Sequence, residues 1–286
     1  MTKLINPPWN PQFLANSPMF EPLITFAHKL AVFKDGWPNL DDYQALLMQH
    51  PESILTRNGI PLRIAAQGPR PRCLEEQYAS RIYLTGEIQT RAGNWHDFFQ
   101  LLTWLIFPKT KAAINTIHHQ AATERFVGGT DNDGRRSPIE NMLSLFDEGG
   151  AIVVCSDAKL LHMIREFDWK NLFWKHRATL IEKMNCIIFG HALYEKALTP
   201  YVGMTANSVL LPVDPGFFSK PIDEKIKIID ELLSIIFING NNYRDTQALS
   251  PLPILGMPGW DAHNAHESYY DNTRYFRPGR TKQSSL

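Results

Sequence analysis

Four polar residues at the start of a predicted helix are of types that move protons or bind anions. Asn94, His96 and Asp97 open the helix, and Gln100 lies four residues after His96, so His96 and Gln100 share one helical face. The free amide groups of a helix N-terminus stabilise an anion there. The pattern favours a ligand-binding face. An ordinary alternative fits equally well, in which Asn94 caps the helix, Asp97 complements its dipole and His96 lies at the surface.

A second candidate pair, His191 and Glu195, follows the apolar run CIIFG, which predicts a buried strand. Gly190 makes the turn, so His191 leaves the C-terminal end of that strand, where open α/β sheets bind ligands. An imidazole and a carboxylate four residues apart can ligate one metal ion, or the carboxylate can orient the imidazole. Because HxxxE often occurs by chance, a purely structural hydrogen bond between the two is the alternative.

Polar residues also lie on the helix predicted next along the chain. Asn115 lies three residues before His118 and four before His119, so it shares a face of that helix with either histidine. We expect this face to meet His96 if the two helices fold into an antiparallel hairpin around Pro108.

One further helix is predicted to begin at Pro138, with Ser137 as its N-cap. Arg136, directly before it, can clamp a phosphate or a carboxylate. Asp147 and Glu148 follow the same helix, and we expect them to be solvated turn residues.

We hypothesise that these residues converge on one pocket of an intracellular enzyme. It would hydrolyse an anionic ester, such as a phosphoester, by general acid–base chemistry with or without a divalent metal. The predicted catalytic residues are His96, Asp97, His191 and Glu195, and the predicted ligand-binding residues are Asn94, Gln100, Asn115 and Arg136. The predicted metal ligands are His96, His118, His191 and Glu195, a set that suits Zn, Mn or Fe.

Two other functions fit the same sequence. A non-catalytic scaffold would bind a small ligand or a partner protein through Trp95, Trp104, Trp260 and the aromatic residues of the tail, and its histidines would be scattered and individually paired. Nucleic-acid binding would need a local patch of aromatic side chains with Arg125, Arg135 and Arg136. The equal numbers of basic and acidic residues, 29 of each, disfavour nucleic acid as a partner.

Apolar periodicity predicts a mostly helical α+β fold with a small buried sheet in one domain, residues 1–286. An extended arm (1–17) begins it, and a strap rich in proline and aromatic residues (249–286) ends it. A flexible loop is predicted over 127–136. Strands are predicted over 61–66, 151–155 and 186–189, and helices over 20–33, 40–48, 74–84, 94–107, 109–125, 157–167, 172–183 and 224–238, besides the one that begins at Pro138.

Composition sets limits on partners and compartment. With 44% hydrophobic and 20% charged residues, the chain is expected to fold into a globular protein. No apolar run reaches the roughly 20 residues of a membrane-spanning helix, and no secretory leader is recognisable, so we expect a cytoplasmic protein without a membrane partner. Cys73, Cys155 and Cys186 are far apart, which predicts three buried thiols rather than disulfides.

Several long strings occur in a fixed order: TGEIQTRAGNWHDFFQLLTWLIFPKTKAAINTIH, RSPIENMLSLFDEGG, FGHALYEKALTP, PLPILGMPGW and YYDNTRYFRPGR. In these strings the chain resembles the bacterial family called domain of unknown function 3025, over roughly residues 70 to 280. The family has no assigned activity and no established catalytic residues, so the resemblance implies none here.

Overall fold

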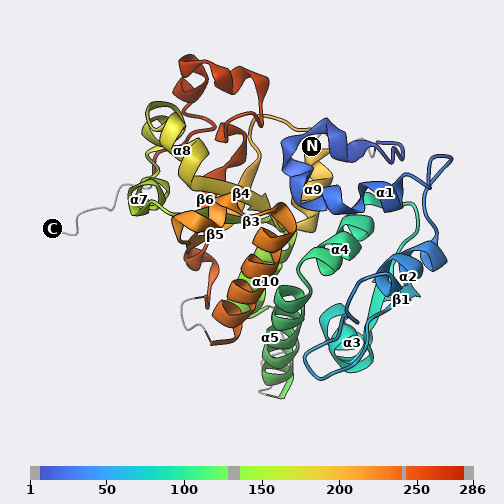
Figure 1. Cartoon of the computed structure of the whole chain (residues 1–286). Coiled ribbons are helices and arrows are strands. Elements are labelled where there is room, and N and C mark those ends of the chain that lie inside the picture. Colours follow the sequence, from blue (N-terminus) through green and yellow to red (C-terminus); the bar gives the residue numbers. More distant parts are fainter. Residues whose placement is uncertain (1–6, 128–135, 240–242, 280–286) are drawn as a thin grey trace.

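The structure, a computed structural model, describes residues 7–127, 136–239 and 243–279, and helices make up most of it (Figure 1). The first half contains the 3₁₀ helices η1 (Phe13–Asn16) and η2 (Pro18–Phe26), then α1 (Ala27–Leu30), α2 (Leu40–Met48), β1 (Arg63–Ala66), α3 (Tyr78–Thr85), β2 (Glu87–Thr90), α4 (Trp95–Ile106), α5 (Pro108–Val127) and α6 (Pro138–Gly149). The second half contains β3 (Gly150–Cys155), α7 (Ala158–Arg165), the π-helical turn η4 (Asn171–Lys175), α8 (Arg177–Lys183), β4 (Met184–Ile188), α9 (His191–Ala197), β5 (Thr205–Pro212), α10 (Ile222–Asn239) and β6 (Ser250–Pro253), with short 3₁₀ turns around them.

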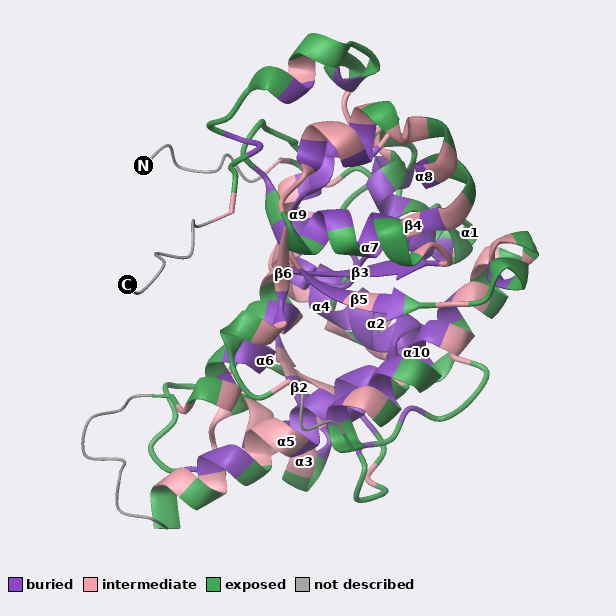
Figure 2. Cartoon of the chain, turned by 90° about the vertical axis from the view of Figure 1, so that its left-hand side faces the viewer, coloured by how far each residue is buried: buried purple, intermediate pink, exposed green. Residues whose placement is uncertain are grey.

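A four-stranded sheet lies at the centre, in the order β4-β3-β5-β6. Strand β3 runs antiparallel to β4 and parallel to β5, and β6 is antiparallel to β5. Every residue of β3 is buried, as its unbroken apolar sequence requires. Figure 2 shows the buried sheet between α7 and α8 on one side and α6 and α10 on the other. The chain is thus an α+β protein with a small buried sheet.

Helix prediction succeeded where periodicity and caps agreed. The helices predicted over 40–48, 94–107 and 109–125 are α2, α4 and α5, within two residues at each end. The helix predicted over 20–33 is wrong in type, because this segment is mainly the 3₁₀ helix η2 with Pro22 inside it. Proline lacks the amide donor that a continuous α-helix needs. Most of the loop predicted over 127–136 lies outside the described residues.

Aromatic side chains help to hold the two ends of the described chain. In the N-terminal arm, Trp9 Nε1 donates to Phe33 O at 2.7 Å, and Trp95 Nε1 donates to Pro7 O at 2.8 Å. The arm is not extended throughout, since η1 turns it at Phe13. In the C-terminal strap, the Tyr275 hydroxyl donates to Met204 O at 2.7 Å and accepts from Leu255 N at 2.9 Å.

The structure tests the prediction that all three cysteines are buried. Cys73 is exposed, so the prediction of three buried thiols is wrong there, whereas Cys155 and Cys186 are buried in β3 and β4.

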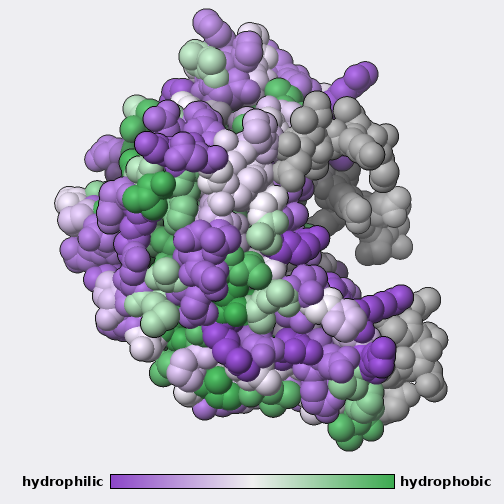
Figure 3. Space-filling model, turned by 90° about the vertical axis from the view of Figure 1, so that its right-hand side faces the viewer, coloured by the Kyte–Doolittle hydropathy of each residue, from purple (hydrophilic) through white to green (hydrophobic). Residues whose placement is uncertain are grey.

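Among the described residues, no helix combines the length and the apolar character needed to cross a membrane. Figure 3 shows that one side of the molecule is mainly polar, with apolar residues scattered over it.

Candidate functional site

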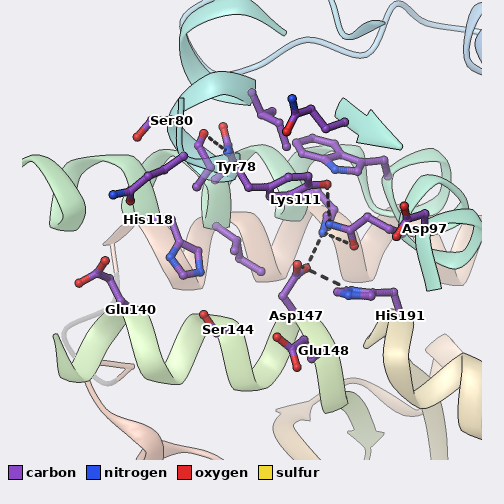
Figure 4. A pocket seen from close by; sticks show the side chains of 18 of the residues that line it. Tyr78, Ser80, Asp97, Lys111, His118, Glu140, Ser144, Asp147, Glu148 and His191 are labelled. Carbon is purple, nitrogen blue, oxygen red and sulfur yellow. Dashed lines mark hydrogen bonds and ion pairs between the residues drawn. The ribbon is translucent and has the colours of Figure 1, made fainter. Parts of the chain in front are cut away.

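A cavity of about 520 Å³ opens between α3, α4, α5 and α6 and ends at the first residue of α9 (Figure 4). Its volume lies within the range of about 300–1,000 Å³ typical of small-molecule sites. Polar side chains from five helices line it, among them Tyr78, His96, Gln100, Lys111, Asn115, His118, Arg136, Ser144, Asp147 and His191.

Helix α4 carries one wall of the cavity. Its lining residues His96, Gln100 and Trp104 recur every four positions, which puts them on one face of the helix, as predicted for the first two. Asn94 caps α4 by accepting from Asp97 N at 3.0 Å. The opposite face of the helix packs in the aromatic core, so α4 is fixed on one side and lines the cavity on the other.

Helix α5 carries a second wall through Lys111, Asn115 and His118, spaced four and three residues apart. Its N-terminus is capped from α10, because Asp230 accepts from Lys109 N at 3.0 Å and from Thr110 N at 2.8 Å. Helix α5 continues away from the end of α4 (Figure 1), so the predicted hairpin, in which it folds back alongside residues 95–106, is wrong.

Two histidines meet at one end of the cavity. His96 Nε2 and His191 Nε2 are 3.0 Å apart, although the two residues are 95 positions apart in sequence. Behind His96, Glu195 Oε2 lies 3.1 Å from Nδ1. Behind His191, Asp147 Oδ2 lies 3.8 Å from Nδ1, too far for a hydrogen bond but near enough for its charge to act. Each imidazole ring thus lies between the other imidazole and a carboxylate.

This arrangement assigns the protons of the pair. The hydrogen bond to Glu195 raises the pKa of His96 above its usual value, which favours the imidazolium. Burial lowers the pKa of His191 to about 3, so its ring is neutral. A proton on His191 Nδ1 faces the Asp147 carboxylate and leaves the Nε2 lone pair to accept from His96 Nε2–H. With this tautomer, the 3.0 Å contact is a hydrogen bond from His96 Nε2–H to His191 Nε2.

A buried ion pair continues the chain of contacts from Asp147. Lys111 Nζ donates to Asp147 Oδ1 and, at 3.1 Å, to Gln100 Oε1; Gln100 Nε2 donates to the Tyr78 hydroxyl at 3.0 Å. Burial alone would raise the pKa of Asp147, but the buried Lys111 ammonium brings it below its usual value. Burial lowers the pKa of Lys111. Asp147 is therefore paired and ionised, and the prediction that it is a solvated turn residue is wrong.

Backbone packing brings His191 to Asp147. A side chain on Gly190 would place its Cβ 2.3 Å from Glu148 O and 2.5 Å from Gly150 N, so only glycine allows this approach. The backbone amide of Gly190 also donates to Gly150 O at 2.9 Å. The start of α9 is thereby held against the end of α6.

The other end of the cavity holds a different group of side chains. Figure 4 shows His118, Glu140 and Ser144 away from the His191 end. Burial lowers the pKa of His118 to about 4, so this imidazole is neutral. Arg136 Nη1 donates to Ser144 Oγ at 2.9 Å, and its guanidinium is exposed at the mouth. Glu140 accepts from Arg125 Nε at 3.2 Å.

A comparison with protein families matches residues 62–280 to the model described as "Protein of unknown function (DUF3025)". This chain belongs to the DUF3025 family. The matched segment contains every residue that lines the cavity. No match was found among curated proteins or among solved structures.

The predicted site residues of this DUF3025 protein fall into two groups. His96, Asp97, Gln100, Asn115, His118, Arg136 and His191 line the cavity, and Glu195 supports His96 from behind. Asn94 is the cap of α4 and is not among the lining residues. Asp97 is engaged by Arg91, whose Nε and Nη2 donate to it at 2.9 and 2.8 Å. Asp97 thus orients Arg91 instead of facing the histidine pair.

The structure brings three of the four predicted metal ligands, His96, His191 and Glu195, to one end of the cavity but does not arrange them around a common point. His118 lies at the opposite end of the cavity from His191 (Figure 4), and Glu195 is bonded to His96 Nδ1. Within the parts of the chain that the structure describes, no group of three or more His, Cys, Asp or Glu side chains is arranged to hold a metal ion. The arginine patch suggested for nucleic acid lacks support too, because Arg125 is paired with Glu140 and Arg135 is outside the described residues.

Two contributors in the DUF3025 cavity were not predicted, Lys111 and Tyr78. Lysine is almost always exposed, so a buried one goes against expectation. A signal was available, since Lys111, Asn115 and His118 share one helical face and Lys111 is followed by the apolar run AAI. For Tyr78 the sequence offers no comparable signal.

Proposed function

We propose that this DUF3025 protein is an enzyme that hydrolyses a small anionic ester, with the His96–His191 pair as its acid–base centre. The observation that supports this most is the 3.0 Å contact between two Nε2 atoms at the end of a cavity, with a carboxylate behind each ring. A histidine pair suits proton transfer when the pKa of one ring is raised and that of the other is lowered, as it is for His96 and His191.

The reaction uses His96 as the acid. Water attacks the ester centre, the bond from that centre to the leaving oxygen breaks, and His96 Nε2 gives its proton to the leaving oxygen. His191 Nε2 takes the proton that the water releases and passes it to His96 Nε2 over 3.0 Å. Because the pKa of His96 is raised and that of His191 is lowered, this last transfer is downhill and restores the resting pair.

Arg136 is the proposed group for binding the anionic part of the substrate. It lies at the opposite end of the cavity from His191, and its described hydrogen-bond partner in that end is the neutral Ser144 hydroxyl. A guanidinium binds phosphate and carboxylate equally well in a forked geometry. The proposed substrate therefore carries its phosphate or carboxylate at the Arg136 end and its scissile ester at the histidine end.

Turnover of para-nitrophenyl phosphate, bis(para-nitrophenyl) phosphate and para-nitrophenyl acetate tests the proposal. We expect His96→Gln to lower the rate on the active ester by about a hundred- to ten-thousandfold, the usual contribution of a general acid. His263→Gln is the matched control, because His263 is exposed and bonded to its neighbour Asp261. Full activity in His96→Gln would refute the proposal. Binding of inorganic phosphate without turnover of any ester would favour the non-catalytic scaffold instead.

A further inference from the structure

Two residues that line the middle of the cavity carry buried polar atoms without a hydrogen-bond partner among the described residues. They are the indole Nε1 of Trp104, which is 1% exposed, and the amide Oδ1 of Asn115, which is 5% exposed. His191 Nδ1 is a third such atom in the cavity, and it lies 3.8 Å from Asp147 Oδ2. Buried polar groups are almost always paired, so the two in the middle of the cavity need a physical reason. One is a donor and the other an acceptor.

The orientation of Asn115 is fixed. Its Nδ2 donates to Ala79 O at 2.7 Å, so turning the amide over would break that bond and place two acceptors together. Oδ1 is therefore held as an acceptor that a ligand must satisfy with an N–H or O–H. Trp104 Nε1 is a donor in every state and requires an acceptor.

We propose that the middle of this cavity recognises a carboxamide, whose N–H donates to Asn115 Oδ1 and whose carbonyl accepts from Trp104 Nε1–H. An amide carries both groups on adjacent planar atoms and remains neutral. That suits the surroundings, where Trp104 and Ile114 offer apolar surface. This inference deepens the proposed function by naming the substrate class, and it rests on the cavity being the ligand site.

The order of side chains along α5 gives the shape of the ligand. At a rise of 1.5 Å per residue, Asn115 lies about 6 Å along the helix from Lys111 and about 4.5 Å from His118. Lys111 bonds the carboxylate that faces His191, and Arg136 lies near enough to His118 to lower its pKa. The ligand is therefore an elongated anion with the scissile ester at one end, an amide in the middle and the negative charge at the other end.

Titration of the ¹⁵N-labelled full chain with N-acetylglycine tests this by NMR, because the probe carries an amide and a carboxylate. The resonance of the Trp104 indole N–H, identified by its loss in Trp104→Phe, should shift and saturate. Acetoxyacetate, which has an ester oxygen in place of the amide N–H, should bind about tenfold more weakly. In Asn115→Leu the two probes should bind equally.

Two outcomes overturn the inference: no saturable shift of the Trp104 resonance, or equal affinity of the wild type for both probes. The remaining backbone spectrum shows whether each variant is folded, and Trp104→Phe, which should weaken both probes, provides a second test if Asn115→Leu does not fold. Because the titration needs no turnover, amide selectivity can fail while hydrolysis that depends on His96 persists. If amide selectivity is found but no hydrolysis depends on His96, only the catalytic proposal is refuted.

Discussion

Replacing Lys111 with methionine should reveal how much the fold depends on one buried ion pair. The side chain of Lys111 is 3% exposed and that of Asp147 is 17% exposed, so methionine preserves the apolar stem and leaves the carboxylate in the interior without its cation. Removing one partner of a buried pair costs about 3–5 kcal/mol. Because Asp147 keeps some solvent contact and still faces His191, we expect a loss near 3 kcal/mol of unfolding free energy, at the low end of that range.

The unfolding free energy lost in Lys111→Met should depend on pH, and the pKa of Asp147 sets the direction of that dependence. In the native protein the pKa of Asp147 is lowered, so its contribution to stability is present above the unfolded value of about 3.9 and is lost as the pH falls. Without Lys111, burial raises the folded pKa of Asp147. In the variant, Asp147 therefore contributes stability below its unfolded pKa, and this contribution is lost as the pH rises. The difference between the two proteins should therefore be large near about pH 8 and small near about pH 4.

Urea unfolding followed by tryptophan fluorescence at both pH values measures these differences. Lys109→Met is the matched control on the same helix, because Lys109 is 58% exposed and should change stability by less than about 0.5 kcal/mol. In the double variant, Asp147→Asn removes the uncompensated charge and should recover part of the loss from Lys111→Met. An equal loss at both pH values, or no recovery in the double variant, would refute this account of the pair.

Three further predictions concern the charge, the packing and the thiols. Glu195→Gln removes the carboxylate that raises the pKa of His96, so that pKa should fall toward the usual value of about 6.5 in an NMR titration, and an unchanged value would contradict our proton assignment. Gly190→Ala forces a Cβ to within 2.3 Å of a backbone carbonyl oxygen, so it should lower the melting temperature by several degrees, and an unchanged melting temperature would argue against the close contact. A thiol reagent should modify Cys73 in the native protein but reach Cys186, whose pKa burial raises to about 12, only on unfolding; mass spectrometry would expose the opposite order.

Most of the helices could be predicted from the sequence, but part of the central sheet could not, and the physical reasons differ. The capping box of Ser137 and Glu140 and the apolar stripe of α4 are local signals, and both elements follow them. Strand β6 contains Pro251 and Pro253, which exclude a strand by propensity. It exists because it lies at the edge of the sheet, where proline is tolerated and β5 supplies the pairing.

The site was partly predictable because its histidines stand beside element ends that the sequence marks. His96 follows a helix cap and His191 follows a strand and a glycine, so both could be selected without coordinates. Their contact could not be foreseen, since it depends on how α9 meets α4 across 95 residues of chain. Lys111 was missed for a related reason. Its burial is stabilised by Asp147, a residue from another helix.

The surroundings of the two histidines favour proton transfer from His191 to His96 in the proposed reaction. Along the chain of contacts, Glu195 raises the pKa of His96, burial lowers the pKa of His191 to about 3, and Lys111 lowers the pKa of Asp147. Moving a proton from His96 to His191 would place a cation in the more buried ring and separate Glu195 from its partner. Lys111 already neutralises Asp147, so this carboxylate cannot fully stabilise an imidazolium at His191. Burial, helped by the nearby lysine, therefore keeps the inner histidine neutral, and the outer histidine holds the proton that the proposed reaction uses.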